Sequence, residues 1–299
     1  MSATLEQVDR RVGAAEELLS VTHTMKGLAA VNARHFEQAA AALDDYQAIV
    51  DRGLQVIAIQ PEFRVPGDAP ANRRSPGRGP LDLIVFGSNQ GLCGPINRHM
   101  VRHVIHAISE PGVEIGHVFA VGARLGTELE LAGIAPDVHV ALPNTVEGIT
   151  PRADELLLRI DRRRRERPDA SVTLVYPRFE GRRRSYQPST RPLLPFDTGR
   201  LDELRRRPWP TNQRPMSFSP SAPMLTALIR QALFVAVHRS FAQTMASVAA
   251  SRLAAMESAQ RDIEERLDEL QAERHRLRQS AITEELLDVV SGFAVLEAQ

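Results

Sequence analysis

Apolar residues recur every seven positions between Leu5 and Ile57, in two interleaved series. The first series is Val8, Ala15, Thr22, Ala29, Phe36, Leu43, Val50 and Ile57, and the second is Leu5, Val12, Leu19, Lys26, Ala33, Ala40, Gln47 and Leu54. Two such series form one seam on a helix, and a strict seven-residue period predicts a left-handed coiled coil. At about 1.5 Å per residue, this helix would be roughly 80 Å long.

Both ends of this first helix carry sequence signals. Thr4 and Gln7 fit a capping box at its start, and Pro61 ends it after about Gln60. Three glycines lie inside it, at Gly13, Gly27 and Gly53. Each glycine costs about 1 kcal/mol relative to alanine, so the helix needs a packing partner.

A second apolar repeat near the C-terminus supplies that partner. From Met224 to Leu296 the chain has no proline and one glycine, Gly292. Within this run, apolar residues repeat every seven positions at Met256, Ile263, Leu270 and Leu277. We therefore expect the two terminal helices to pair antiparallel, with the middle of the chain inserted between them.

The middle of the chain alternates between strand and helix patterns. Strand candidates are residues 81–86, 115–121, 138–142 and 172–179, and helix candidates are residues 95–109, 124–132 and 154–166. Such alternation predicts βαβ units and a mostly parallel sheet. The predicted fold class is α/β: a long antiparallel coiled coil of the terminal helices with an inserted Rossmann-like α/β domain.

These patterns divide the chain into five segments. They are an N-terminal coiled-coil helix (1–62), a flexible loop rich in proline and glycine (63–80), the α/β domain (81–180), an irregular Pro/Arg-rich region (181–223) and a C-terminal coiled-coil helix (224–299). A hairpin or extended strand is expected near Tyr186 to Phe196, and the rest of that region is expected to be irregular.

Composition removes several classes of protein. The formal net charge is zero, so the whole chain is no polyanion binder, and 43% apolar with 25% charged residues is ordinary for a folded protein. Cys93 is the one cysteine, so no intrachain disulfide can form. The N-terminus has no signal-peptide core and no stretch approaches 18 uninterrupted apolar residues. We expect any membrane association to run through partners.

Several motifs have a chemical and a structural interpretation. The loop at 87–97 (GSNQGLCGPIN) follows a strand and opens a helix, where phosphates bind, but it matches neither dinucleotide-binding nor Walker A spacing, which favours a structural turn. Cys93 is more typical of a buried thiol than of a nucleophile.

The histidines and arginines also allow two interpretations. His99 and His103 have the spacing of zinc ligands on a helix, but no glutamate stands between them, which favours packed histidines. The arginine runs 162–165, 182–184 and 205–207 could bind nucleic acid or anionic lipid, but acidic residues balance them.

A pair of neighbouring polar residues interrupts the predicted seam of the first helix. Thr22 and Lys26 stand at seam positions, with small residues around them. A polar seam residue fixes the register of a coiled coil at a cost in stability. Alternatively, the partner helix leaves this stretch free for another, close-fitting protein. The sequence leaves both interpretations open.

Five stretches resemble the gamma subunit of F-type ATP synthases, the central rotor shaft. Residues 21–30 (VTHTMKGLAA) resemble that family's I-T-K-A-M-K-M-V-A-A, and residues 91–97 match G-L-C-G-x-x-N. Residues 252–256 (RLAAM) resemble R-M-x-A-M, residues 278–285 (RQSAITEE) resemble R-Q-A-x-I-T-Q-E, and residues 289–292 (VVSG) resemble I-V-x-G. Asn89 and Gln90 depart from the pattern, which suggests a divergent branch such as the alternative, sodium-type F-ATPases.

The resemblance implies a non-catalytic subunit with no catalytic residue, cofactor or metal of its own. Its partners would be the alpha and beta subunits of the catalytic head, the epsilon subunit and the c-ring, at the cytoplasmic face of the bacterial inner membrane. The matching contact residues are Met25 and Lys26, near the beta-subunit levers, and Arg278, Gln279, Thr283 and Glu284, at the beta catch loops. Two rivals stay open: a coiled-coil nucleic-acid binder that uses the arginine clusters, and a small α/β enzyme with a phosphate ligand.

Overall fold

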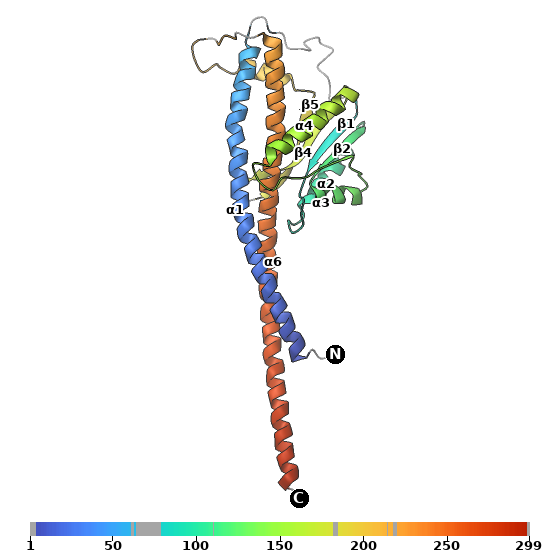
Figure 1. Ribbon diagram of the computed structural model, residues 1–299, viewed down its shortest axis with the longest axis vertical. Helices are drawn as coiled ribbons and strands as arrows, with labels where there is room; N and C mark the ends of the chain where they lie inside the picture. The colour runs from blue at the N-terminus through green and yellow to red at the C-terminus, as the bar shows by residue number, and fades with distance from the viewer. Residues whose placement is uncertain are drawn as a thin grey trace. The chain divides into compact units, whose positions relative to one another are not determined.

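The computed structural model describes residues 4–60, 63, 79–109, 111–181, 185–213, 215–217 and 220–297 (Figure 1). The elements in order are α1 (Leu5–Ala58), β1 (Leu81–Phe86), α2 (Ile96–Ile108), β2 (Ile115–Val121), α3 (Ala123–Leu131), β3 (Val138–Val140), α4 (Ile149–Glu166), β4 (Ser171–Glu180), β5 (Ser185–Leu194), α5 (Gly199–Arg206) and α6 (Ser221–Glu297). The chain forms two compact units. The first unit is 1–29 with 253–299, and the second is 30–252.

The first unit is an antiparallel pair made by the start of α1 and the end of α6. Val8 and Val12 pack on Leu270, with further apolar seam residues at Ala15, Leu267 and Leu277. At the helix start, the Thr4 N–H donates to Gln7 Oε1 and the Gln7 N–H donates to Thr4 Oγ1. The predicted capping box and the antiparallel pairing are therefore both confirmed.

Burial along α1 follows the predicted heptads. Every member of the two series is buried or half-buried, including the polar members Thr22, Lys26 and Gln47. The four predicted seam residues of α6 are likewise buried or half-buried. The seven-residue period predicts the burial of both helices because a coiled-coil seam returns to the partner helix once every two turns.

The second unit holds a five-stranded sheet in the order β3-β2-β1-β4-β5. The β3-β2, β2-β1 and β1-β4 pairs are parallel, and β5 is antiparallel to β4. The order 3-2-1-4 is that of a Rossmann half-fold, in which crossover helices join parallel strands. The predicted α/β class, coiled coil and mostly parallel sheet are confirmed.

Both faces of the sheet are covered, so the parallel strands read as continuous apolar runs. On one face, α2 and α3 pack Met100, Val104 and Leu125 on Leu83 and Val85. On the other face lies a larger cluster to which α1, α4 and α6 contribute (Figure 1). At its centre Phe241 of α6 meets Phe86 of β1 edge to face, with ring centroids 5.1 Å apart.

The region beyond residue 181 is more regular than the sequence predicts. β5 lies where an extended strand is expected, but α5 occupies a segment expected to be irregular. Leu201 and Leu204 of α5 are buried against the end of α1 and the start of α6. Arg200 bonds both carboxylate oxygens of Asp51 at 2.7 and 2.8 Å, which ties α5 to α1. Most of the predicted loop 63–80 lies outside the described residues.

Among the described residues, α6 alone passes a length-and-composition test for a membrane-crossing helix. An 18-residue window within it reaches a mean hydropathy of 1.2, and 28% of that window is buried. The core helices of soluble proteins pass the same test, so it is weak evidence. In α6, apolar residues such as Val237, Phe241 and Met245 pack in the larger core cluster.

Candidate functional site

The predicted contact residues Met25 and Lys26 lie half-buried on α1, within the first unit. Lys26 Nζ donates to Gln260 Oε1 over 3.0 Å, and Gln260 Nε2 donates to Glu264 Oε1 over 2.8 Å. The partner of Lys26 across the seam is therefore a neutral side-chain amide. An amide carbonyl accepts the hydrogen bond and leaves the ammonium charge uncancelled.

Thr22, the other polar seam residue, is satisfied inside its own helix. Its side chain is 7% exposed, and its hydroxyl donates to the Leu18 carbonyl over 2.8 Å. A buried hydroxyl without a partner would be costly, and this back-bond removes that cost. Thr22 thus makes no cross-helix hydrogen bond in the structure.

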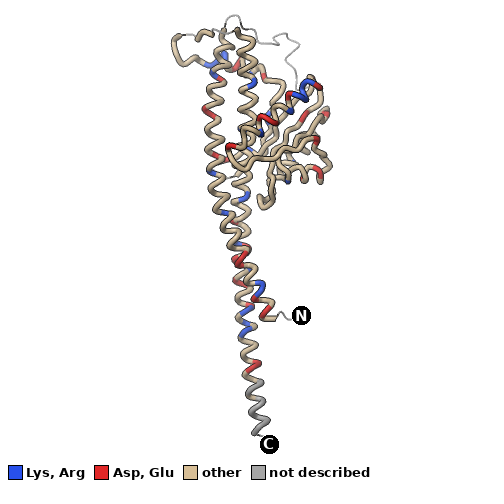
Figure 2. Tube along the Cα trace, in the orientation of Figure 1, with Lys and Arg blue, Asp and Glu red and all other residues tan. Residues whose placement is uncertain are grey.

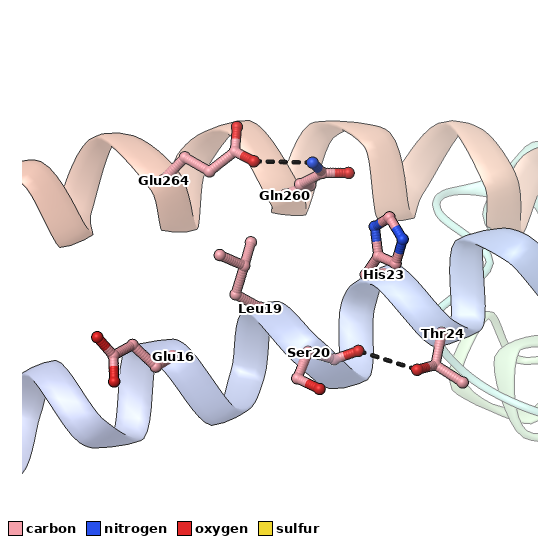
Figure 3. A pocket seen from close by; sticks show the side chains of 7 residues that line it. All are labelled: Glu16, Leu19, Ser20, His23, Thr24, Gln260 and Glu264. Carbon is pink, nitrogen blue, oxygen red and sulfur yellow. Dashed lines mark hydrogen bonds between the residues drawn. The ribbon is translucent and has the colours of Figure 1, made fainter.

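An open groove of about 400 Å³ lies between α1 and α6 beside these residues (Figure 3). Most of the residues that line it have polar side chains, although apolar atoms make up much of the lining surface: Glu16, Leu19, Ser20, His23, Thr24, Gln260 and Glu264. Leu19 points from α1 toward α6, while the Glu264–Gln260 and Thr24–Ser20 bonds run along each helix. Within the described part of the chain, no three His, Cys, Asp or Glu side chains gather as a metal site would require.

The outward side of α1 carries an apolar stripe that the sequence analysis missed. Leu18, Val21 and Leu28 are exposed, and half-buried Met25 falls between them at helical spacing. Exposed apolar side chains on a polar helix mark a docking surface when they are contiguous. The sequence does show this stripe, as a further set of apolar residues at helical spacing that belongs to neither of the two seam series.

The other predicted contact residues lie further along α6, in the same unit. Arg278, Gln279, Thr283 and Glu284 are all exposed. The Thr283 hydroxyl donates to the Gln279 carbonyl over 2.9 Å. Apolar neighbours on the same stretch are also exposed: Ile282, Leu286, Leu287 and Val290. The structure does not bring this group to Lys26, because Gln260 precedes Arg278 by about 27 Å of helix.

The G-L-C-G loop follows β1 and is held together by several side-chain hydrogen bonds. Asn97 Oδ1 accepts from the Ser88 N–H over 2.9 Å, and Asn97 Nδ2 donates to Ser88 Oγ over 2.9 Å. The Cys93 thiol, 2% exposed, donates to Ser88 Oγ over 3.2 Å. A Cβ at Gly87 would lie 2.6 Å from Asn97 Oδ1, so glycine is required there. These contacts fit the structural interpretation of the loop.

The histidines of α2 face β5. His99 Nδ1 lies 2.8 Å from the Tyr186 hydroxyl, and His103 Nε2 lies 2.8 Å from Thr190 Oγ1. Burial, with a smaller contribution from nearby His106, lowers the pKa of His103. Burial also raises the pKa of Tyr186. Both partners are on β5, so this pair packs against the sheet edge.

Some arginines of these runs have partners within the described part of the chain. In the basic end of α4 (Figure 2), Arg163 meets Asp82 at 3.3 Å and Arg165 meets Asp161 at 2.5 Å. Arg205 donates to the Ala58 carbonyl over 2.6 Å. The run 182–184 lies outside the described residues. This pairing gives no support to nucleic-acid binding.

The sequence matches the family model described as ATP synthase over residues 4–296. The ATP synthase gamma chain of Cupriavidus metallidurans is 24% identical over 306 residues, covering 98% of this chain and all of that one. The gamma chain of Solibacter usitatus is 26% identical over 317 residues, covering 98% of this chain and 99% of that one.

Solved structures share the fold. A chain of the Euglena gracilis mitochondrial ATP synthase, OSCP/F1/c-ring, superposes with a TM-score of 0.66 at 14% identity, over 98% of this chain and 95% of that one. A chain of the Tetrahymena thermophila central stalk and c-ring gives 0.53 at 18% identity, over 80% and 99%. From the family match over nearly its whole length, the chain belongs to the ATP synthase family as a gamma chain, the non-catalytic subunit of the central stalk.

Proposed function

We propose that this gamma chain turns inside a head of alpha and beta subunits and joins that head to a c-ring. The observation that carries the proposal is the seam, in which both long helices bury their apolar heptad positions against each other. Two packed helices resist bending better than one, which suits a shaft. Relatives named as gamma chains, and like folds from head, rotor and c-ring assemblies, support these partners.

The shaft works through asymmetry. Three chemically identical beta subunits can differ only if each meets a different face of one central element. A ligand shifts a conformational equilibrium by its differential affinity for the two states, and the shaft acts as that ligand. Rotation exchanges the faces, so ion flow through the membrane sector drives release of ATP, and ATP hydrolysis drives the reverse rotation.

Two sets of residues are proposed to meet the beta subunits. Lys26, with Met25 beside it, contacts the beta levers, and its uncancelled charge together with the exposed apolar stripe supports this role. Arg278, Gln279, Thr283 and Glu284 contact the catch loops, and their exposure on α6 supports that assignment. The α6 set is polar and exposed, and the α1 set consists of one charged and one apolar side chain, both half-buried.

The proposal extends to the setting of the complex. The α/β domain forms the foot of the shaft with the epsilon subunit, above the c-ring. The assembly sits at the cytoplasmic face of the bacterial inner membrane, with this chain peripheral. The family membership supports this arrangement.

Co-expression with the alpha and beta subunits encoded beside it tests the function. We expect a tag on this chain to purify a complex of three alpha, three beta and one gamma, with ATP hydrolysis that requires this chain. A matched preparation without the gamma chain is the control. If folded alpha and beta subunits fail to co-purify, the shaft function is wrong.

A further inference from the structure

A row of polar side chains on α6 meets the sheet of the α/β domain. Gln243, Ser247 and Ser251 are four residues apart and so lie on one face of the helix. We call these three residues the polar row. Each makes a hydrogen bond to backbone outside α6, and the partners are Phe179, Pro177 and Cys93 in that order.

Two of the three bonds reach β4, and the third reaches the loop that follows β1. Gln243 Oε1 accepts from the Phe179 N–H over 2.8 Å, and the Ser247 hydroxyl donates to the Pro177 carbonyl over 2.9 Å, both in β4. The Ser251 hydroxyl donates over 2.6 Å to the carbonyl of Cys93, in the loop after β1. The polar row therefore joins α6 to the C-terminal part of β4 and to the loop that follows β1, the strand next to β4 in the sheet.

Hydrogen bonds and apolar packing constrain a helix differently. The apolar contacts of α6 with the sheet are non-directional, so they oppose separation more than rotation of the helix about its axis. A hydrogen bond needs a narrow range of distance and angle. Ser247 is fully buried and Ser251 is 8% exposed, so breaking either bond would leave a buried polar group without a partner.

Two other hydroxyls on α6 are equally buried but do not reach the sheet. Ser240 donates to the Ala236 carbonyl over 3.0 Å, and Thr244 donates to the Ser240 carbonyl over 2.6 Å. Both bonds stay within α6. Ser240 and Thr244 therefore differ from Ser247 and Ser251 in the element that they bond, since all four are buried hydroxyls.

We propose that the polar row is the torque joint between the α/β domain and α6. It holds the rotational position of α6 against β4 and the loop after β1, so that rotation of the domain turns the helix without slip. Since α6 is one continuous helix from Ser221 to Glu297, a fixed rotation at the row is passed along it. This inference rests on the proposed function.

The assembled complex in inverted membrane vesicles tests the joint. We compare Ser247→Ala/Ser251→Ala with the control Ser240→Ala/Thr244→Val, and measure ATP hydrolysis together with the ATP-driven membrane potential. We expect hydrolysis to be kept in both. The fraction of turnovers that slip should rise about five-fold for each bond lost from the row, since one net hydrogen bond changes an equilibrium by about that factor.

A conservative variant separates the hydroxyl from the shape of the side chain. Ser251→Thr keeps the hydroxyl at a slightly exposed position and should retain coupling, whereas Ser251→Ala should lose it. Equal loss of membrane potential in the polar-row and control variants would overturn the joint. So would a loss fully explained by less assembled complex in the vesicles.

The isolated chain gives a second readout that does not depend on assembly. Spin labels on exposed Leu158→Cys of α4 and Ala227→Cys of α6 report the position of α6 against the domain. We expect the Ser247→Ala/Ser251→Ala variant to broaden the distance distribution and the control to leave it narrow. A narrow distribution in both would reject the joint. Failure of the unsubstituted chain to assemble would count against the proposed function alone.

Discussion

Lys26 of α1 donates a 3.0 Å hydrogen bond to the side-chain amide of Gln260 on α6, and so bridges the seam without an ion pair. The same Gln260 side chain donates from Nε2 to the Glu264 carboxylate over 2.8 Å, so Lys26 is linked to this carboxylate through the amide. Lys26 is also the one lysine in the chain. The ammonium group has donors left over for a partner carboxylate.

Replacement of Lys26 by alanine should reduce coupled ATP synthesis about ten-fold while leaving the isolated chain folded, because a hydrogen-bonded charge contributes about 1.5–3 kcal/mol to a contact. Lys26→Arg keeps the charge and is the control. The measurement is ATP synthesis in energised vesicles, with circular dichroism of the isolated chain. If the Lys26→Ala variant synthesises ATP at an unchanged rate, the proposed contact of Lys26 with the beta subunit is wrong.

The Gly27→Ala variant tests whether the stretch around Lys26 binds another protein or only sets the register of the coiled coil. A Cβ at Gly27 would meet nothing within 4 Å, so the substitution should stabilise the isolated chain by about 1 kcal/mol. We expect the assembled complex to lose turnover, because a close-fitting beta lever would meet the added methyl. Thermal unfolding and ATP hydrolysis measure the two effects. Higher stability with full turnover would favour the register interpretation instead.

Arg278→Ala should weaken function and not folding. Arg278 is exposed on α6, and substitutions at such positions usually change stability by less than about 0.5 kcal/mol. Arg276→Ala, also exposed on the same helix, is the matched control. We expect slower ATP hydrolysis by the complex for Arg278→Ala alone. Equal rates for the two variants would show that the catch-loop contact does not depend on Arg278.

Arg163→Ala should destabilise the α/β domain strongly. Asp82 in β1 is 1% exposed, accepts from the His117 N–H over 2.7 Å and pairs with Arg163 at 3.3 Å. Removal of the arginine leaves a buried carboxylate uncompensated, which costs about 3–5 kcal/mol. Chemical denaturation measures the loss. Asp82→Asn/Arg163→Ala removes the stranded charge and should recover part of it; no recovery would contradict the charge argument.

Protonation of His238 should lower the stability of the chain in mild acid. Burial lowers the pKa of His238, against smaller opposing effects of its own backbone hydrogen bond and of Asp154. Nδ1 is buried without a hydrogen-bond partner among the described residues. Because the folded pKa lies below the unfolded value of about 6.5, stability is full above that pH and falls as the pH drops below it. His238→Gln should flatten the decline in melting temperature; an unchanged slope would assign the decline to other groups.

Several elements could be predicted from the sequence because a single local rule decides them. β1 and β2 have the bounds predicted for them, since strands covered on both faces are continuous apolar runs. The seams of α1 and α6 follow from their heptads. By contrast, α5 contains only two buried leucines in a short charged segment, which is too little periodicity to predict a helix.

The sequence by itself determined the two long helices, their antiparallel pairing and the βαβ alternation, and it placed the proposed contact residues, Met25 and Lys26 among them, within those helices. Only the tertiary structure decided which atoms meet: Gln260 opposite Lys26, and the polar row on the backbone of β4 and of the loop after β1. Periodicity reports which face of an element is buried. The choice of partner between residues remote in the chain depends on register and packing across the whole fold, which no local pattern encodes.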